Sequence, residues 1–216
     1  MIPADVPSPI DLKDMVDAQE WERTAMKRPF REEFFEAFNT QLGLLEEPSL
    51  SAIELGAGPG FLALHILVRR PNIHYTLLDF SSAMHTLAKR RLEPLIGVDV
   101  KYIECDFKTA GWADSLGQYD AVLSNQAVHE LRHKRYALDF FRQIRSLLKP
   151  GGILLFCDHY YGEGGLNNDQ LYMSLEEQRE VLRSAGFNAS EVLVKGGRAL
   201  YSARLESKGL GSKGSE

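Results

Sequence analysis

Glycines that follow a short apolar run predict that the chain binds a ligand through its backbone. Gly56, Gly58 and Gly60 come directly after residues 51–55, and glycine lets a chain turn tightly and approach a ligand with no side chain between them. Asp79 ends the next apolar run, about 20 residues after Gly60, the spacing expected of an acid that binds a nucleoside. Because a carboxylate accepts hydrogen bonds from both hydroxyls of a ribose, we expect a nucleoside-containing cofactor.

The end of the third apolar run offers partners for a purine base. Asp106 supplies a hydrogen-bond acceptor, and Phe107 supplies an aromatic face. A dinucleotide fingerprint, G-x-G-x-x-G, would require glycine at position 61, where the sequence has Phe61. The pattern therefore predicts an adenosine-bearing cofactor and disfavours NAD.

Short apolar runs alternate with amphipathic helical patterns along most of the chain. This order is typical of an α/β sandwich with a mostly parallel sheet. In such a sheet, ligands bind beyond the carboxyl ends of the strands, where the strand order reverses. The predicted strands are 51–55, 74–78, 100–105, 119–124, 153–158, 190–194 and 199–205, and helices are predicted over 30–45, from the glycine loop to 69, and over 81–92, 133–148 and 174–186.

The last two predicted strands are joined by a short glycine-containing segment, 195–198, which predicts an antiparallel hairpin at a sheet edge. We therefore predict a Rossmann-like, doubly wound α/β fold with a seven-stranded, mostly parallel sheet. We expect an N-terminal helical cap over 1–48, a cofactor-binding domain over 49–206 and a flexible tail over 207–216.

Composition and charge disfavour several classes of partner. The 216 residues carry a formal net charge of -5, which on average repels nucleic acids and anionic membranes. No apolar stretch approaches the roughly 20 residues that cross a bilayer. The first residues lack the basic start and apolar run of a secretory signal. We therefore expect a cytoplasmic protein with no nucleic-acid or membrane partner; the oligomeric state stays open.

The strand before the glycine loop also contains an acid. Residues 54–60 read E-x-G-x-G-x-G, and here the sequence resembles the class I methyltransferases that use S-adenosyl-L-methionine. Residues 77–81, 104–107, 119–126 and 148–152 are similar to further motifs of that family and occur in its order. The resemblance covers about 51–205 and implies a methyl transfer in which the protein mainly aligns the reactants.

The resemblance also implies which residues hold the methionyl and ribose parts of the cofactor. Glu54 would hold the loop or the amino group, and Asp79 would bind the ribose. Asn125 and Gln126 would border the sulfonium. The loop residues that would meet the methionyl part are Gly56, Ala57, Gly58 and Gly60.

Four further residues would surround the adenine if the resemblance holds. Phe80 and Met84 would line the ring, Asp106 would accept a hydrogen bond from its amine, and Phe107 would offer a backbone amide.

The acceptor side is less clearly marked. His129 would lie at the mouth of the site, where a neutral imidazole could take a proton from an oxygen or nitrogen nucleophile; alternatively, it only packs or orients the loop. His159, Tyr160 and Tyr161 would shape the acceptor pocket. In the family that the sequence resembles, enzymes that methylate DNA bases or glutamine side chains often have Pro-Pro after this Asn or Asp. Asn125 is instead followed by Gln126, which argues against those acceptors. We expect a methyltransferase acting on an oxygen or nitrogen of a small molecule.

Two other functions remain as alternatives. The glycine loop and Asp79 would serve equally well in a non-catalytic module that binds S-adenosylmethionine. A minor alternative is a zinc metalloprotease, because residues 129–133 read H-E-x-x-H. The extended form of that motif would need glycine and histidine where the chain has Tyr136 and Asp139. For this reason we predict no metal site.

Overall fold

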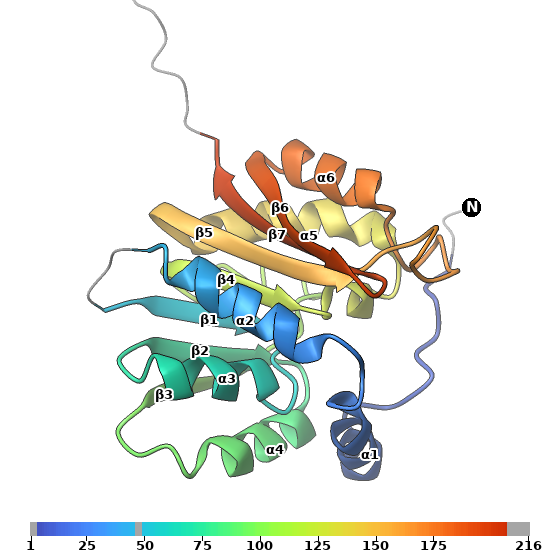
Figure 1. Ribbon diagram of the computed structural model, residues 1–216. Helices are drawn as coiled ribbons and strands as arrows, with labels where there is room; N and C mark the ends of the chain where they lie inside the picture. Colours follow the sequence, from blue (N-terminus) through green and yellow to red (C-terminus); the bar gives the residue numbers. More distant parts are fainter. Residues whose placement is uncertain (1–3, 46–48, 207–216) are drawn as a thin grey trace, which may run out of the picture.

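A seven-stranded sheet with the order β3-β2-β1-β4-β5-β7-β6 forms the centre of the molecule (Figure 1). The computed structural model describes residues 4–45 and 49–206. Strands β1 to β5 run parallel, and β7 is antiparallel to both β5 and β6. The predicted fold class and its C-terminal hairpin are confirmed. The strands are β1 (Ser51–Leu55), β2 (His74–Asp79), β3 (Asp99–Glu104), β4 (Tyr119–Asn125), β5 (Leu148–His159), β6 (Phe187–Lys195) and β7 (Arg198–Leu205).

Helices cover both faces of this sheet (Figure 1). One core, which includes Phe38 and Ile66, lies under α2 and α3, and a second core, which includes Phe141 and Leu182, lies under α5 and α6. None of the helices in the described part of the chain is long and apolar enough to span a membrane. The helices are α1 (Met15–Ala25), α2 (Arg31–Leu42), α3 (Phe61–Arg69), α4 (Ser82–Leu92), α5 (Ala137–Ile144) and α6 (Leu175–Ser184), with 3-10 turns η1 (Val128–Leu131), η2 (Lys134–Tyr136) and η3 (Arg145–Leu147).

Side-chain caps set where two of these helices begin. The Ser81 hydroxyl accepts a hydrogen bond from the Met84 N–H at 3.1 Å, so α4 begins directly after the end of β2. Ser174 and Glu177 form the capping box that their spacing predicts, which starts α6. Both helix starts lie where the sequence places them.

The described part of the region predicted as an N-terminal cap contains two α-helices with different neighbours. The aromatic side chains of α2, among them Phe34, Phe35 and Phe38, are buried in the core on one face of the sheet. α1 instead lies beside α4, where Ala18 contacts the cluster around Leu87. Residues 46–48 and the predicted tail, 207–216, lie outside the described residues.

Several elements differ from the sequence-based prediction, among them α1, for which no helix was predicted, and β6, which begins at Phe187 instead of Ser190. The helix expected over 133–148 is divided into η2, α5 and η3. Strand β5 begins at Leu148 instead of Ile153, because Leu148 pairs with Tyr119 before extra residues in β5 shift the register to Ala121 opposite Ile153. A Pro-Gly-Gly sequence therefore occurs near the start of this strand, where pairing is already irregular.

We expect Phe38→Ala to lower the free energy of unfolding by about 3–5 kcal/mol, because it removes a fully buried aromatic ring from the core under α2. Urea denaturation followed by circular dichroism measures this loss. Val16→Ala in α1, where the side chain is 72% exposed, is the control and should change stability by less than about 0.5 kcal/mol. If Phe38→Ala lowers the free energy of unfolding no more than Val16→Ala does, the side chains of α2 do not contribute to the core as described.

Candidate active site

A cavity of about 800 Å³ lies at the carboxyl ends of the parallel strands. Its wall includes Glu54 at the end of β1, Asp79 at the end of β2 and Asn125 at the end of β4. β1 pairs with β2 on one side and with β4 on the other, so the strand order reverses at this point. This is where a doubly wound sheet binds its ligand.

The glycine loop is fastened to the end of β2. The N–H groups of Gly56 and Ala57 donate to the Leu78 carbonyl, and the N–H of Gly58 donates to the Asp79 carboxylate at 2.8 Å. Gly56 has a φ of 68°, and a Cβ there would stand 2.4 Å from the Cβ of Ala127. Only glycine therefore lets the loop pass so close to the segment after β4, and the loop presents backbone to the cavity.

Asp79 joins the glycine loop to the start of α4 and still faces the cavity. Its second oxygen accepts the N–H of Ser81 at 2.9 Å. Burial raises the pKa of Asp79, although the hydrogen bonds from Gly58 and Ser81 oppose this shift. Each carboxylate oxygen has a further lone pair, so two hydroxyl groups of a ligand can still donate to this residue.

Glu54 is a buried acid in the wall of the cavity. Its side chain accepts a hydrogen bond from the Tyr75 hydroxyl at 2.8 Å. Burial raises the pKa of Glu54 to about 8, and the nearby Asp79 acts in the same direction. A cationic group of a ligand would favour the charged form of this carboxyl, because opposite charges stabilise each other most strongly where water is excluded.

Two amide side chains after β4 have buried polar atoms with no protein partner in the described structure. These atoms are Oδ1 of Asn125 and both Oε1 and Nε2 of Gln126. Gln126 has a φ of 56°, and its N–H donates to the Cys157 carbonyl at 2.7 Å. Buried polar atoms normally have partners, so unpaired amides in the cavity wall are where a polar ligand would bind.

A histidine and a buried aspartate form a hydrogen-bonded pair on the other side of the cavity. Nδ1 of His129, in η1, lies 2.7 Å from Oδ1 of Asp158, near the end of β5. The other oxygen of Asp158 accepts the His129 N–H at 2.9 Å, and Oδ1 also accepts the N–H of His159. The carboxylate therefore fixes both the backbone and the ring of His129. In neutral His129, a proton on Nδ1 leaves Nε2 as the proton acceptor.

The pair shifts the pKa values of both partners. Burial opposes a charge on His129, but Asp158 outweighs this effect, and the pKa of His129 is raised. Burial alone would raise the pKa of Asp158, whereas His129 and the His159 N–H lower it, and the net shift is downward. The neighbouring His159 behaves differently: burial lowers its pKa to about 4, so this ring is neutral at physiological pH.

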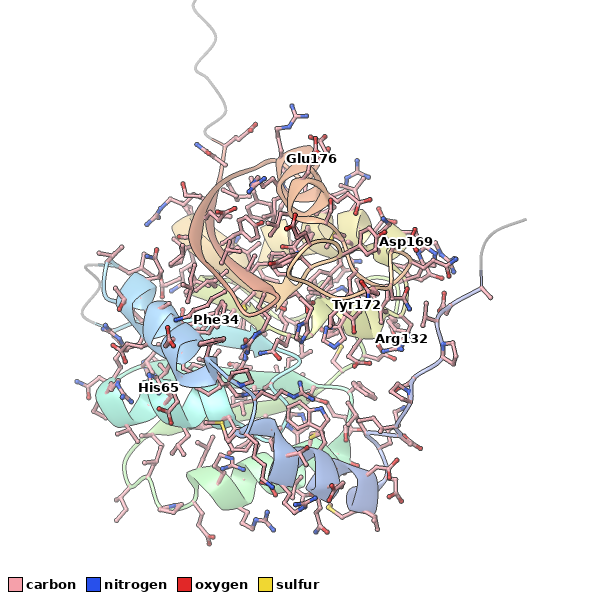
Figure 2. All side chains as sticks on the ribbon, turned by 45° about the vertical axis from the view of Figure 1, so that its right-hand side comes forward. Phe34, His65, Arg132, Asp169, Tyr172 and Glu176 are labelled. Carbon is pink, nitrogen blue, oxygen red and sulfur yellow. The ribbon has the colours of Figure 1, made fainter. Side chains whose placement is uncertain are left out.

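The N-terminal segment, residues 6–12, lies along the cavity. Its residues Val6, Pro7 and Leu12 all line the cavity. Arg132 fixes one end of the segment, since its guanidinium donates to the carbonyls of Val6 and Pro7 at 2.9 and 2.7 Å. The Ser81 hydroxyl fixes the other end by donating to the Leu12 carbonyl. Figure 2 shows Arg132 and Tyr172 on the side of the molecule along which this segment runs.

The cavity brings most of the predicted site residues together. Among the described residues, those predicted for the site that line it are Glu54, Gly56, Ala57, Gly58, Asp79, Phe80, Met84, Phe107, Asn125, Gln126, His129 and His159.

Four predicted residues lie outside this wall. Gly60 precedes α3 and packs against Ala88, while Asp106 accepts the N–H of Lys108. Tyr160 is buried in the core, and Tyr161 is 40% exposed.

Sequence reasoning did not single out Tyr172 or Asp158. The ring centroid of Tyr172 lies 5.7 Å from that of His129. Nothing distinguishes it in the sequence from other aromatic residues of the segment between β5 and α6. In the sequence, Asp158 is the last residue of the predicted strand 153–158. Its position at the carboxyl end of a strand is the one sequence feature that could have marked it as a site residue.

The H-E-x-x-H segment is not a metal-binding helix. η1 ends at Leu131, and Arg132 has a φ of 66°, which interrupts the helix before His133. His133 instead accepts the N–H of Arg135 through its Nδ1. Within residues 4–45 and 49–206, no group of three or more histidine, cysteine or acidic side chains is arranged to hold a metal ion. The metalloprotease alternative therefore loses its geometric basis.

Comparison with known proteins finds similarity to methyltransferases. Residues 53–154 match the model of a methyltransferase domain. The non-reducing polyketide synthase nvfA of Aspergillus novofumigatus is 31% identical over 159 residues, which cover 64% of this chain and 7% of the synthase. This chain therefore spans only a small part of that relative.

Solved structures share the fold at lower sequence identity. A complex of DhpI with SAH has a TM-score of 0.67 and 22% identity, and the match covers 89% of this chain and 95% of DhpI. The carbon methyltransferase of CurJ has a TM-score of 0.61 and 18% identity, with 76% of this chain and 51% of that chain covered. Residues 53–154 therefore match a methyltransferase-domain model, and the chain shares the fold of these solved methyltransferases.

Proposed function

We propose that this protein transfers a methyl group from S-adenosylmethionine to an oxygen or nitrogen atom of a small molecule, with His129 as the proton acceptor. The hydrogen bond between His129, which lines the cavity, and the buried Asp158 behind it carries this proposal. A module that only binds the cofactor has no use for an oriented base. The pair therefore favours catalysis over the binding-module alternative.

The residues at the strand ends fit the cofactor. Asp79 would accept hydrogen bonds from the ribose hydroxyls, and Glu54 would face the amino group of the methionyl part. The unpaired amide atoms of Asn125 and Gln126 would receive polar partners. A cavity of about 800 Å³ lies in the upper part of the range for ligand sites and has room for an acceptor beside the cofactor.

S-Adenosylmethionine supplies a methyl group already activated by a positively charged sulfur. With the cofactor bound, the acceptor atom would form a bond to the methyl carbon as the carbon–sulfur bond breaks, and the bonding electrons would stay on sulfur. Nε2 of His129 takes the proton that the acceptor loses, and Asp158 stabilises the imidazolium that results. The protein otherwise aligns the reactants, and the glycine loop and the N-terminal segment reduce the access of water.

Carbon is a second candidate for the acceptor atom. The relative nvfA is named as a polyketide synthase, and the CurJ structure is that of a carbon methyltransferase. A carbon between two carbonyl groups is acidic, and the same base can remove its proton. Incubating the protein with S-adenosylmethionine labelled in the methyl group and with phenols, amines and β-keto thioesters decides between these acceptors. Label in none of the acceptors, despite tight cofactor binding, would favour the binding module.

We expect Asp79→Ala to weaken S-adenosylmethionine binding by about 2–4 kcal/mol, because it removes charge-assisted hydrogen bonds to the ribose. Isothermal titration calorimetry measures the change in Kd. Asp99→Ala removes a carboxylate from an exposed position at the start of β3 and is the matched control. Unchanged affinity in Asp79→Ala would contradict the ribose contact.

We expect Asp158→Asn to lower the pKa of His129, because it replaces the negative charge that stabilises the imidazolium. The base must be neutral, so methyl transfer should fall as the pH drops through this pKa, and in Asp158→Asn that fall should occur at lower pH. NMR titration of the imidazole measures the pKa without an acceptor. The same pKa in both proteins would refute the coupling. His74→Gln, which changes an exposed histidine, is the control for activity.

A further inference from the structure

Three arginines gather near the acceptor side of the cavity from distant parts of the chain. Arg28 and Arg31 come from the segment between α1 and the first turn of α2, and both line the cavity. Arg198 begins β7 and pairs in register with His159, which also lines the cavity. Arg28 and Arg198 both act electrostatically on His159, which places their charges near the His129 side of the cavity.

Arg31 and Arg198 are buried but incompletely paired. Arg31 is 5% exposed, its Nη1 is 3.4 Å from the Ala25 carbonyl, and its Nε has no partner. Arg198 is 2% exposed and donates to the Pro29 carbonyl, while its Nε and Nη1 have no partner. In the described part of the chain, no carboxylate forms an ion pair with either residue or with Arg28.

Aromatic rings support the cluster without neutralising it. Arg28 and Arg31 lie 5.4 and 5.5 Å from the ring centroid of Trp21, and Arg198 lies 4.8 Å from that of Phe34. The acids that line the same cavity have other partners: Glu20 pairs with Arg23, Asp17 accepts the N–H of Asp11, and Glu54 accepts a hydrogen bond from Tyr75. None of these acids forms a hydrogen bond or ion pair with the three arginines, although Glu54 acts electrostatically on Arg31.

Burial and the neighbouring positive charges destabilise the charged form of Arg31. Burial lowers its pKa to about 10, and the charges of Arg28 and Arg198 act in the same direction. The backbone is also strained here, because Phe30 has a φ of 61°, a conformation unusual for a bulky side chain. Lys195 contacts the Phe30 ring and pairs with Glu33, which holds this segment against the turn between β6 and β7.

We propose that Arg28 and Arg31, with Arg198 behind them, form an oxyanion subsite, and that the methyl acceptor carries a carboxylate or a phosphonate held there. This inference rests on the proposed function and names the chemical class of its acceptor. Guanidinium groups suit oxyanions because their N–H donors match the spacing of the oxygens. Bound there, the anion positions the acceptor beside His129 and neutralises the buried arginines.

The methionyl carboxylate of the cofactor is the other possible source of an oxyanion. Arg31 is held by the Ala25 carbonyl and interacts electrostatically with Glu54 at the cofactor end. Arg28 lines the cavity, and its side chain forms no hydrogen bond or ion pair with the described residues. Arg28 also acts electrostatically on His159 and Tyr172. We therefore assign the acceptor's anion chiefly to Arg28. The test needs to measure cofactor binding and acceptor binding separately.

The test uses the chain of residues 1–216 saturated with S-adenosylhomocysteine, with benzoate and phenylphosphonate as probes and neutral benzamide as their counterpart. Titration is followed by calorimetry and by fluorescence of Trp21, which lies beside Arg28 and Arg31, in a Trp112→Phe background. We expect at least one of the anions to bind at least about tenfold more tightly than benzamide. Arg28→Gln should remove this preference and change the Kd of S-adenosylhomocysteine by less than about twofold.

Lys27→Gln makes the same change of charge one residue away and is the matched control, because Lys27 is exposed and does not line the cavity. It should keep the preference for the anions. Equal binding of benzamide and both anions, or an unchanged preference in Arg28→Gln, overturns the proposal. An equal loss of S-adenosylhomocysteine affinity in Arg28→Gln also overturns it and assigns the arginine to the cofactor. If the wild-type protein does not bind S-adenosylhomocysteine, the proposed function itself fails.

Discussion

The buried carboxylate of Asp158 is the constraint on which the arrangement of the acceptor side depends. It accepts hydrogen bonds from the backbone and ring of His129 and from the backbone of His159. A buried carboxylate is stable only when such donors surround it. The same contacts hold η1 against the end of β5. The Asp158 side chain therefore both holds the segment after β4 in place and raises the pKa of His129 in that segment.

Charge is distributed unequally around the cavity. Asp79 and Glu54 lie at the proposed cofactor end, where S-adenosylmethionine would bring hydroxyl and cationic groups. Arg28, Arg31 and Arg198 form no ion pair with a carboxylate in the described structure, although Glu54 acts electrostatically on Arg31. In the proposed reaction this distribution of charge would orient an acceptor that has an anionic group, and alignment accounts for a large part of catalysis in a reaction of this kind.

Local sequence patterns predicted the strands, the capped helices and the glycine loop because their signals lie within a few residues. The positions of Asp79 and Asn125 followed from the rule that parallel strands end at one edge. The partner of His129 could not be predicted, because Asp158 meets it only through tertiary packing. The arginine cluster joins the segment before α2 to β7 for the same reason. α1 was missed because only two of its residues, Ala18 and Ala25, are buried, which leaves little periodicity.

A crystal structure of the protein with S-adenosylhomocysteine tests the central claim most directly. The account predicts the ligand along the carboxyl ends of β1, β2 and β4, with its ribose hydroxyls within hydrogen-bond distance of Asp79. Its sulfur should face the side of the cavity formed by His129, with the amides of Asn125 and Gln126 nearby. A ligand bound elsewhere, or a sulfur separated from His129 by the protein chain, would contradict it.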